Sequence, residues 1–122
     1  MRRRKLLIAD DSEMNRAILA NVLDQEFEVI EATNGQEVII ALQSYGTQIS
    51  ALLLDIVMPE MDGFEVLEEM NRRHWIEDIP TIMISAETSN TYIDRAFELG
   101  ASDYISRPFV PGIVRRRIIN TI

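Results

Sequence analysis

Two kinds of segment alternate along this chain. Short runs that are almost wholly apolar, such as Leu6 to Ala9 and Ala51 to Leu54, are typical of buried strands. The longer segments between them carry apolar residues every three or four positions, which is the spacing of a helix with one buried face. The pattern predicts strands at residues 5–9, 27–31, 51–54, 81–84 and 102–105.

Each predicted helix has residues that favour its start or its end. They are Ser12 as N-cap of the first helix, Asn34-Gly35 and Gly46 around the second, Gly63 at the start of a third that runs to about His74, Thr88 or Ser89 and then Gly100 around the fourth, and Pro111 in the first turn of the last. We expect Phe64, Leu67 and Met70 to face inward. The Met and Ile stripes, such as Met14 with Ile18 and Val22 in the first helix, are interpreted as core, and the fourth helix carries Ile93, Ala96 and Phe97 at helical spacing.

Strand and helix alternate five times with short connections, and the strands are largely apolar. This predicts an α/β fold with a doubly wound, five-stranded parallel sheet covered by helices on both faces. The commonest strand order for such a flavodoxin-like (βα)5 fold is 2-1-3-4-5. No repeat or linker divides the chain, so we expect one domain over residues 1–122.

Composition narrows the function classes. The net charge of -8 argues against direct nucleic-acid binding, because neutralising phosphates needs a basic face. We interpret the two basic runs, Arg2 to Lys5 and Arg115 to Arg117, as solvated ends. The chain has no cysteine, so disulfides and thiolate metal sites are excluded. No apolar run is long enough for a membrane span or a signal peptide, so a cytoplasmic location is the default expectation.

Three aspartates follow two of the predicted strands. Asp10 and Asp11 come directly after the first strand, and Asp55 follows the third. In the order 2-1-3-4-5 these strands are neighbours at the switch point, where ligands bind in such folds. Each aspartate alone also suits a turn, and Asp11 could cap the first helix. Together, the three carboxylates would repel one another unless a cation bridges them, and Mg²⁺ suits such a site.

Two further strand ends supply matching groups. Ser85 offers a hydroxyl donor and is followed by the small Ala86, while Arg107 lies just beyond the last strand and before Pro108. A carboxylate nucleophile, a metal ion, a hydroxyl and a fixed cation together suit phosphoryl transfer. The sequence therefore predicts that chemistry, with Asp55 as nucleophile.

Four motifs, in order and at matching spacing, resemble the receiver domain of bacterial two-component response regulators over essentially the whole chain. They are Leu7-Ile8-Ala9-Asp10-Asp11, Leu53-Leu54-Asp55 with the segment through Met58-Pro59 to Asp62-Gly63, Ile84-Ser85-Ala86, and Gly100-Ala101-Ser102-Asp103-Tyr104-Ile105-Ser106-Arg107-Pro108-Phe109. The resemblance implies that Asp55 accepts a phosphoryl group from a sensor histidine kinase or a phosphotransfer protein. It also implies that Mg²⁺ is held by Asp10, Asp11, Asp55 and the backbone carbonyl of Val57.

The resemblance implies a switch as well. Ser85 would bind a phosphoryl oxygen and shift, and the ring of Tyr104 would follow it inward. The residues alone favour an ordinary strand aromatic at Tyr104. The surface of the fourth helix, fifth strand and fifth helix would become a homodimer or output interface, the output being a partner protein or a domain fused C-terminally. Such a chain is a regulatory domain, not a turnover enzyme, although it assists its own phosphorylation and dephosphorylation.

Arg107 departs from the family pattern, which has lysine before this proline. An arginine fork is bulkier and planar, whereas lysine is a compact point charge. Either Arg107 pairs with Asp55 and still meets phosphate, or it alters the relay. In the extreme alternative, it locks one conformation and leaves a phosphorylation-independent interaction module.

Two other residue signals and two other functions carry less weight. The only histidine, His74, is interpreted as a surface or capping residue. Val57 and Glu87 match positions that tune the phosphoryl lifetime in the family. A metal-dependent phosphohydrolase is disfavoured, because such enzymes commonly have an acid two residues after the nucleophile and this chain has Val57 there. A flavin-binding protein is disfavoured too, because the acidic segment Asp10 to Glu13 would repel the flavin phosphate.

Overall fold

The computed structural model describes residues 4–87 and 89–122. Five parallel strands form one sheet in the order β2-β1-β3-β4-β5, as the sequence predicted. The strands are β1 (Arg4–Ala9), β2 (Phe27–Ala32), β3 (Ile49–Leu54), β4 (Thr81–Ser85) and β5 (Asp103–Ser106). The helices are α1 (Glu13–Leu23), α2 (Gly35–Tyr45), α3 (Gly63–Arg72), α4 (Asn90–Glu98) and α5 (Pro111–Thr121), with a 3-10 turn η1 (Gly46–Gln48) after α2.

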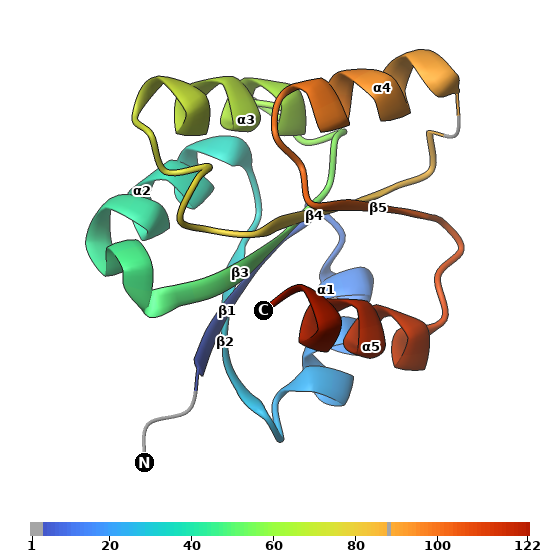
Figure 1. The fold of residues 1–122 in the computed structure, drawn as a ribbon. Coiled ribbons are helices and arrows are strands. Elements are labelled where there is room, and N and C mark those ends of the chain that lie inside the picture. The colour runs from blue at the N-terminus through green and yellow to red at the C-terminus, as the bar shows by residue number, and fades with distance from the viewer. Residues whose placement is uncertain (1–3, 88) are drawn as a thin grey trace.

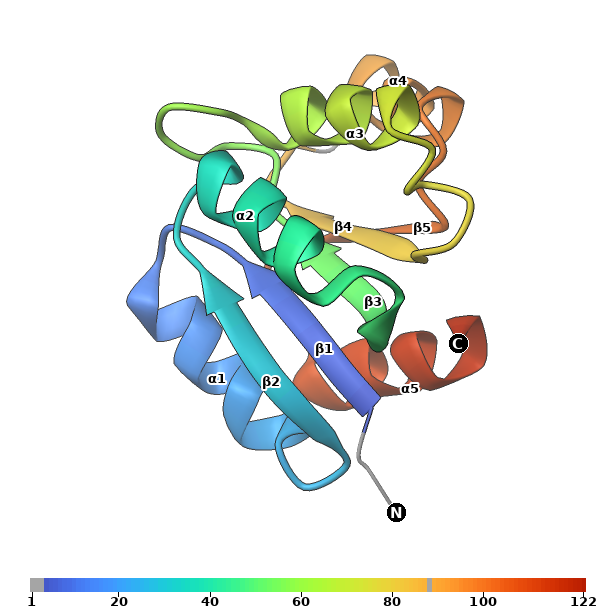
Figure 2. The same cartoon turned by 90° about the vertical axis from the view of Figure 1, so that its left-hand side faces the viewer.

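Helices cover both faces of the sheet. Figures 1 and 2 show α1 and α5 side by side on one face, with α2, α3 and α4 on the other. Alternate residues of β1 serve the two cores: Leu7 packs with the side of α2, α3 and α4, and Leu6 and Ile8 pack with the side of α1 and α5. Burial on both faces explains why the central strands are continuously apolar.

Most predicted helix ends are confirmed by hydrogen bonds. The side chains of Ser12, Asn34 and Ser89 accept bonds from backbone N–H groups in the first turns of α1, α2 and α4. Pro111 begins α5. Thr88, the other predicted cap of the fourth helix, lies outside the described residues, as do Arg2 and Arg3 of the N-terminal basic run.

The buried face of α1 differs from the predicted stripe. Met14 is 72% exposed and Ile18 is 40% exposed, whereas Leu19 and Leu23 are buried. Both pairs have the same four-residue spacing, and the packing of α1 on the sheet selects the second pair. In α4, likewise, Ala96 is buried and Phe97 is 47% exposed.

The third helix ends at Arg72, two residues before the predicted end at His74. His74 has a positive φ of 62°, which a helix does not accommodate. The backbone N–H of Trp75 then donates back to the carbonyl of Met70 and closes the helix end. In α3 itself, Phe64, Leu67 and Met70 are buried, as predicted. Within the described residues no helix is long and apolar enough to cross a membrane.

Candidate functional site

The three aspartates meet at the carboxyl edge of the sheet. Ala9 and Leu54, the last residues of β1 and β3, are paired in register, and the Asp55 N–H donates to the Ala9 carbonyl at 2.9 Å. One carboxylate oxygen from each of Asp10, Asp11 and Asp55 lies within 4.8 Å of the others. The convergence predicted from the strand order is therefore present.

Asp10 is held from three directions. Its backbone N–H donates to the Ala32 carbonyl at 3.1 Å, and its Oδ1 accepts the Ser12 N–H at 2.8 Å. Its Oδ2 pairs with the guanidinium of Arg107. Only 2% of Asp10 is exposed, so these bonds replace the water that its charge has lost.

Asp55 is also buried, with 4% of its surface exposed. Burial raises the pKa of Asp55 to about 6, Arg107 opposes the rise, and the nearby Asp10 adds to it. Backbone N–H groups of Val57 and Ile56 stabilise the charged form. The carboxylate is ionised at neutral pH and is costly to keep in that form without a cation.

Arg107 bridges the two buried aspartates. Its Nη2 lies 3.4 Å from Asp55 Oδ2 and also contacts Asp10. The sequence suggested the pairing with Asp55, whereas the pairing with Asp10 was not anticipated. Within residues 4–87 and 89–122, the Nε of Arg107 is the one buried side-chain polar atom without a hydrogen-bond partner.

A close backbone contact fixes the loop that follows Asp55. The Gly63 N–H donates to the Ile56 carbonyl at 2.7 Å. A Cβ at Gly63 would lie 2.4 Å from the Asp55 carbonyl oxygen, which is far too close. Asp62, just before Gly63, caps α3 in a capping box with Glu65, which the sequence reading did not identify.

Ser85 and Tyr104 converge on residue 87. Ser85 Oγ accepts the Glu87 N–H at 3.1 Å, and the Tyr104 hydroxyl donates to the Glu87 carbonyl at 2.6 Å. Burial raises the pKa of Tyr104, and a hydrogen bond with Ser85 works against the rise. Ser85 is 1% exposed and Tyr104 is 9% exposed, so the ring lies inward in this structure.

The donor set fits a hard divalent cation. Three carboxylates offer oxygen ligands close together, and two of them are buried with like charge. Mg²⁺ is bound in proteins by a small number of carboxylates with water completing its shell. Among the described residues, Arg107 is the one cation that forms an ion pair with these carboxylates, and its single charge leaves room for a metal ion in the charge balance.

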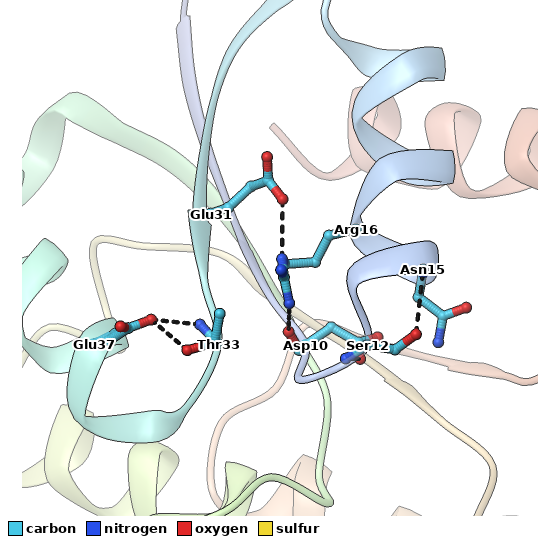
Figure 3. A network of polar contacts seen from close by, with 7 residues as sticks. All are labelled: Asp10, Ser12, Asn15, Arg16, Glu31, Thr33 and Glu37. Carbon is cyan, nitrogen blue, oxygen red and sulfur yellow. Dashed lines mark hydrogen bonds and ion pairs between the residues drawn. The ribbon is translucent and has the colours of Figure 1, made fainter.

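A cation on α1 was missed at the sequence level. Arg16 Nη1 donates to the Asp10 carbonyl at 2.7 Å, and its Nε donates to Glu31 on β2 at 3.0 Å (Figure 3). One signal was available: a cation near the start of a helix opposes the helix dipole and calls for a compensating role.

Comparisons with known proteins identify the family. The family model described as the response regulator receiver domain matches residues 6–119. Response regulator RR06 of Streptococcus pneumoniae is 40% identical over 114 residues, which cover 93% of this chain and 50% of RR06. Transcriptional regulatory protein SrrA of Staphylococcus aureus is 39% identical over 116 residues, which cover 93% and 46%. The chain thus spans about half the length of these relatives.

Solved structures show the same fold. Chemotaxis protein CheY4 of Vibrio cholerae superposes with a TM-score of 0.89 at 25% identity, covering 99% of this chain and all of the other. A putative two-component response regulator with a GGDEF domain superposes with a TM-score of 0.87 at 27% identity, covering 96% of this chain and 48% of the other.

Proposed function

The chain belongs to the response regulator receiver domain family of two-component systems, and from this premise we propose that Asp55 is the phosphoacceptor of a phosphorylation-dependent switch. The proposal takes residues 1–122 as a single receiver domain with a regulatory role. The observation that carries it is the meeting of Asp10, Asp11 and Asp55 at the sheet edge, with Asp55 buried.

The chemistry is transfer of a phosphoryl group to a carboxylate. An Asp55 oxygen attacks the phosphorus of a phosphohistidine, the P–N bond breaks, and the leaving imidazole nitrogen keeps the electron pair and takes a proton from water. The product is an acyl phosphate on Asp55. Arg107, whose Nη2 lies 3.4 Å from Asp55 Oδ2, and the hydroxyl of Ser85, the last residue of β4, would stabilise charge on the transferred oxygens.

The candidate metal ligands are Asp10, Asp11, Asp55 and the backbone carbonyl of Val57. When bound there, Mg²⁺ supplies positive charge that neutralises the phosphoryl oxygens. The protein residues do the rest: Asp10 is fixed by Ser12, and Asp55 is oriented by the N–H groups of the following loop.

The switch follows from the bonds at residue 87. Ser85 Oγ would leave the Glu87 N–H to meet a phosphoryl oxygen, and the switch would start from a Tyr104 ring that is already inward and bonded to the Glu87 carbonyl. Movement there reaches α4, β5 and α5, the surface that we propose for a homodimer or for the output. The output is a partner protein or a further domain, since the chain spans about half the length of its curated relatives.

An apolar groove beside the site suits the phosphodonor protein. A groove of about 570 Å³ runs between α1 and the loop before α5, and its lining includes Ile18, Phe109, Ala86 and Arg107. Exposed apolar surface of this kind is typical of protein interaction sites. A sensor kinase or phosphotransfer protein that docks here would bring its phosphohistidine to the edge where Arg107 and Asp55 lie.

The test is phosphorylation by a small donor. Acetyl phosphate with Mg²⁺ is expected to add one phosphoryl mass to the intact protein, and Asp55→Asn is expected to abolish the gain. Asp103→Asn, which changes a carboxylate on β5 remote from the cluster, is the matched control. A wild-type protein that gains no mass with either acetyl phosphate or a kinase would contradict the proposal.

One observation favours a second candidate, a phosphorylation-independent interaction module. Arg107 already pairs with both Asp10 and Asp55 in this structure, so it could hold one conformation permanently. Beryllofluoride, a phosphoryl mimic, separates the two. A switch predicts shifted amide resonances at Ser85 and Tyr104, and a locked module predicts none.

A further inference from the structure

Arg16 makes a contact that neither the family resemblance nor the proposed chemistry explains. Its side chain is only 12% exposed, although it lies on the first turns of a surface helix. One arm of the guanidinium donates to the carbonyl of Asp10, and the Nε donates to Glu31 on β2 (Figure 3). We infer that Arg16 is a positioning residue for the cation site, which acts through the backbone between Asp10 and Asp11.

The carbonyl that Arg16 holds belongs to the peptide group joining Asp10 to Asp11. Because a peptide group is planar, fixing its oxygen fixes the direction in which the chain leaves Asp10 and enters Asp11. The same group therefore restrains the backbone positions from which the two carboxylates extend. Arg16 binds the backbone that carries both of them.

Asp11 depends on this backbone more than Asp10 does. The Asp10 carboxylate is tied by the Ser12 N–H and by Arg107. Asp11 is exposed, and no side-chain hydrogen bond within residues 4–87 and 89–122 holds its carboxylate. Its place near Asp10 and Asp55 is set by the shape of the turn, which Arg16 closes.

Glu31 holds the guanidinium of Arg16 in place by accepting a hydrogen bond from its Nε. It lies one residue before Ala32, whose carbonyl accepts the Asp10 N–H at 3.1 Å. The end of β2 thus holds Asp10 on its N–H side directly and on its carbonyl side through Arg16. Arginine suits this task because its planar fork donates in two directions at once, which a lysine ammonium does less well.

The sign of one measurement separates positioning from a plain charge effect. Removing a cation near three carboxylates should tighten Mg²⁺ binding if only charge matters. If Arg16 positions the ligands, its loss should weaken Mg²⁺ binding, by about tenfold, as is typical when a residue supporting metal ligands is removed. The inference rests on the proposed function, since it takes the aspartates as the cation ligands.

The experiment titrates Mg²⁺ into the metal-free protein by calorimetry, for wild type, Arg16→Met, Arg16→Lys and Glu31→Gln. We expect the Mg²⁺ dissociation constant to rise about tenfold in Arg16→Met and less in Arg16→Lys and Glu31→Gln. At saturating Mg²⁺, the rate of phosphorylation by acetyl phosphate should return toward the wild-type value. A residue that only stabilised α1 would change the melting temperature and leave the dissociation constant alone.

Lys5→Met is the matched control. Like Arg16, Lys5 is a mostly buried cation, with 16% of its side chain exposed. It pairs with Glu28, which lies on β2 as Glu31 does, but at the opposite end of that strand. We expect no weakening of Mg²⁺ binding in this variant. Equal or tighter Mg²⁺ binding in folded Arg16→Met and Arg16→Lys, with the wild type still phosphorylated, overturns the inference and leaves the proposed function standing. A wild type that neither binds Mg²⁺ nor gains a phosphoryl group overturns both.

Discussion

Replacing Asp55 by asparagine should stabilise the metal-free protein at neutral pH. Burial raises the pKa of Asp55 from 3.8 to about 6, so the folded state pays for holding this charge. At about 1.4 kcal/mol per pKa unit the rise corresponds to about 3 kcal/mol, and water at the mouth of the site reduces this to about 2 kcal/mol. Asp55→Asn removes the charge and keeps the shape, so it should recover about that much free energy of unfolding.

The dependence on pH follows from the direction of the shift. A folded pKa above the unfolded one means that the carboxyl favours folding below about pH 4, and that this contribution is lost as pH rises through about 6. The gain from Asp55→Asn should therefore be full at pH 7.5 and should largely vanish at pH 4.

Urea unfolding followed by circular dichroism, with a chelator present, measures both values. Asp94→Asn, an exposed carboxylate on α4, is the control and should change little. Mg²⁺ at ten times its dissociation constant should stabilise the wild type by about 1.4 kcal/mol and Asp55→Asn by less. An Asp55→Asn variant no more stable than wild type at pH 7.5, or equally stabilised at pH 4, would show that the buried Asp55 charge does not destabilise the folded protein.

Three further changes test other parts of the site. Gly63→Ala should destabilise the protein by about 2 kcal/mol or more, because the added Cβ would lie 2.4 Å from the Asp55 carbonyl oxygen. Gly112→Ala is the control, since a Cβ there meets open space and should not destabilise the protein. Urea unfolding compares the two variants, and equal losses of stability would contradict the predicted clash at Gly63. Arg107→Ala should destabilise the metal-free protein by about 3 kcal/mol, because it leaves the buried carboxylates of Asp10 and Asp55 unpaired. Added Mg²⁺ should stabilise this variant more than it stabilises the wild type. An unchanged melting temperature in the variant would contradict a stabilising role for the ion pairs of Arg107. Tyr104→Phe should lower the free energy of unfolding by about 1 kcal/mol, because it removes the hydrogen bond to the Glu87 carbonyl. An unchanged free energy of unfolding in urea would show that this hydrogen bond makes no net contribution to stability.

Features encoded locally were predictable from the sequence. Apolar runs gave the strands, and Ser12, Asn34 and Pro111 gave helix starts, because each of these signals acts within a few residues of itself. Strand order followed from a general rule for such folds. In that order β1 and β3 are neighbours, so the meeting of Asp10 and Asp55 was predictable.

Features that depend on packing were not predictable. Ile18 and Leu19 have equally good helical partners four residues on, and only contact with the sheet decides which is buried. The Arg107 contact with Asp10 joins residues 97 positions apart, and no local pattern marks it. Arg16 has one local signal, its position near the start of a helix, but that signal does not identify its partner on β2, which is 15 positions away.

The most direct test of phosphorylation at Asp55 is to locate the phosphoryl group chemically. The protein is treated with acetyl phosphate and Mg²⁺, reduced with borohydride to convert an aspartyl phosphate to homoserine, and mapped by peptide mass spectrometry. The prediction is homoserine at position 55, with Asp10 and Asp11 unmodified and no conversion in the absence of Mg²⁺. Conversion at another aspartate, or none in a protein shown to be folded, would contradict it.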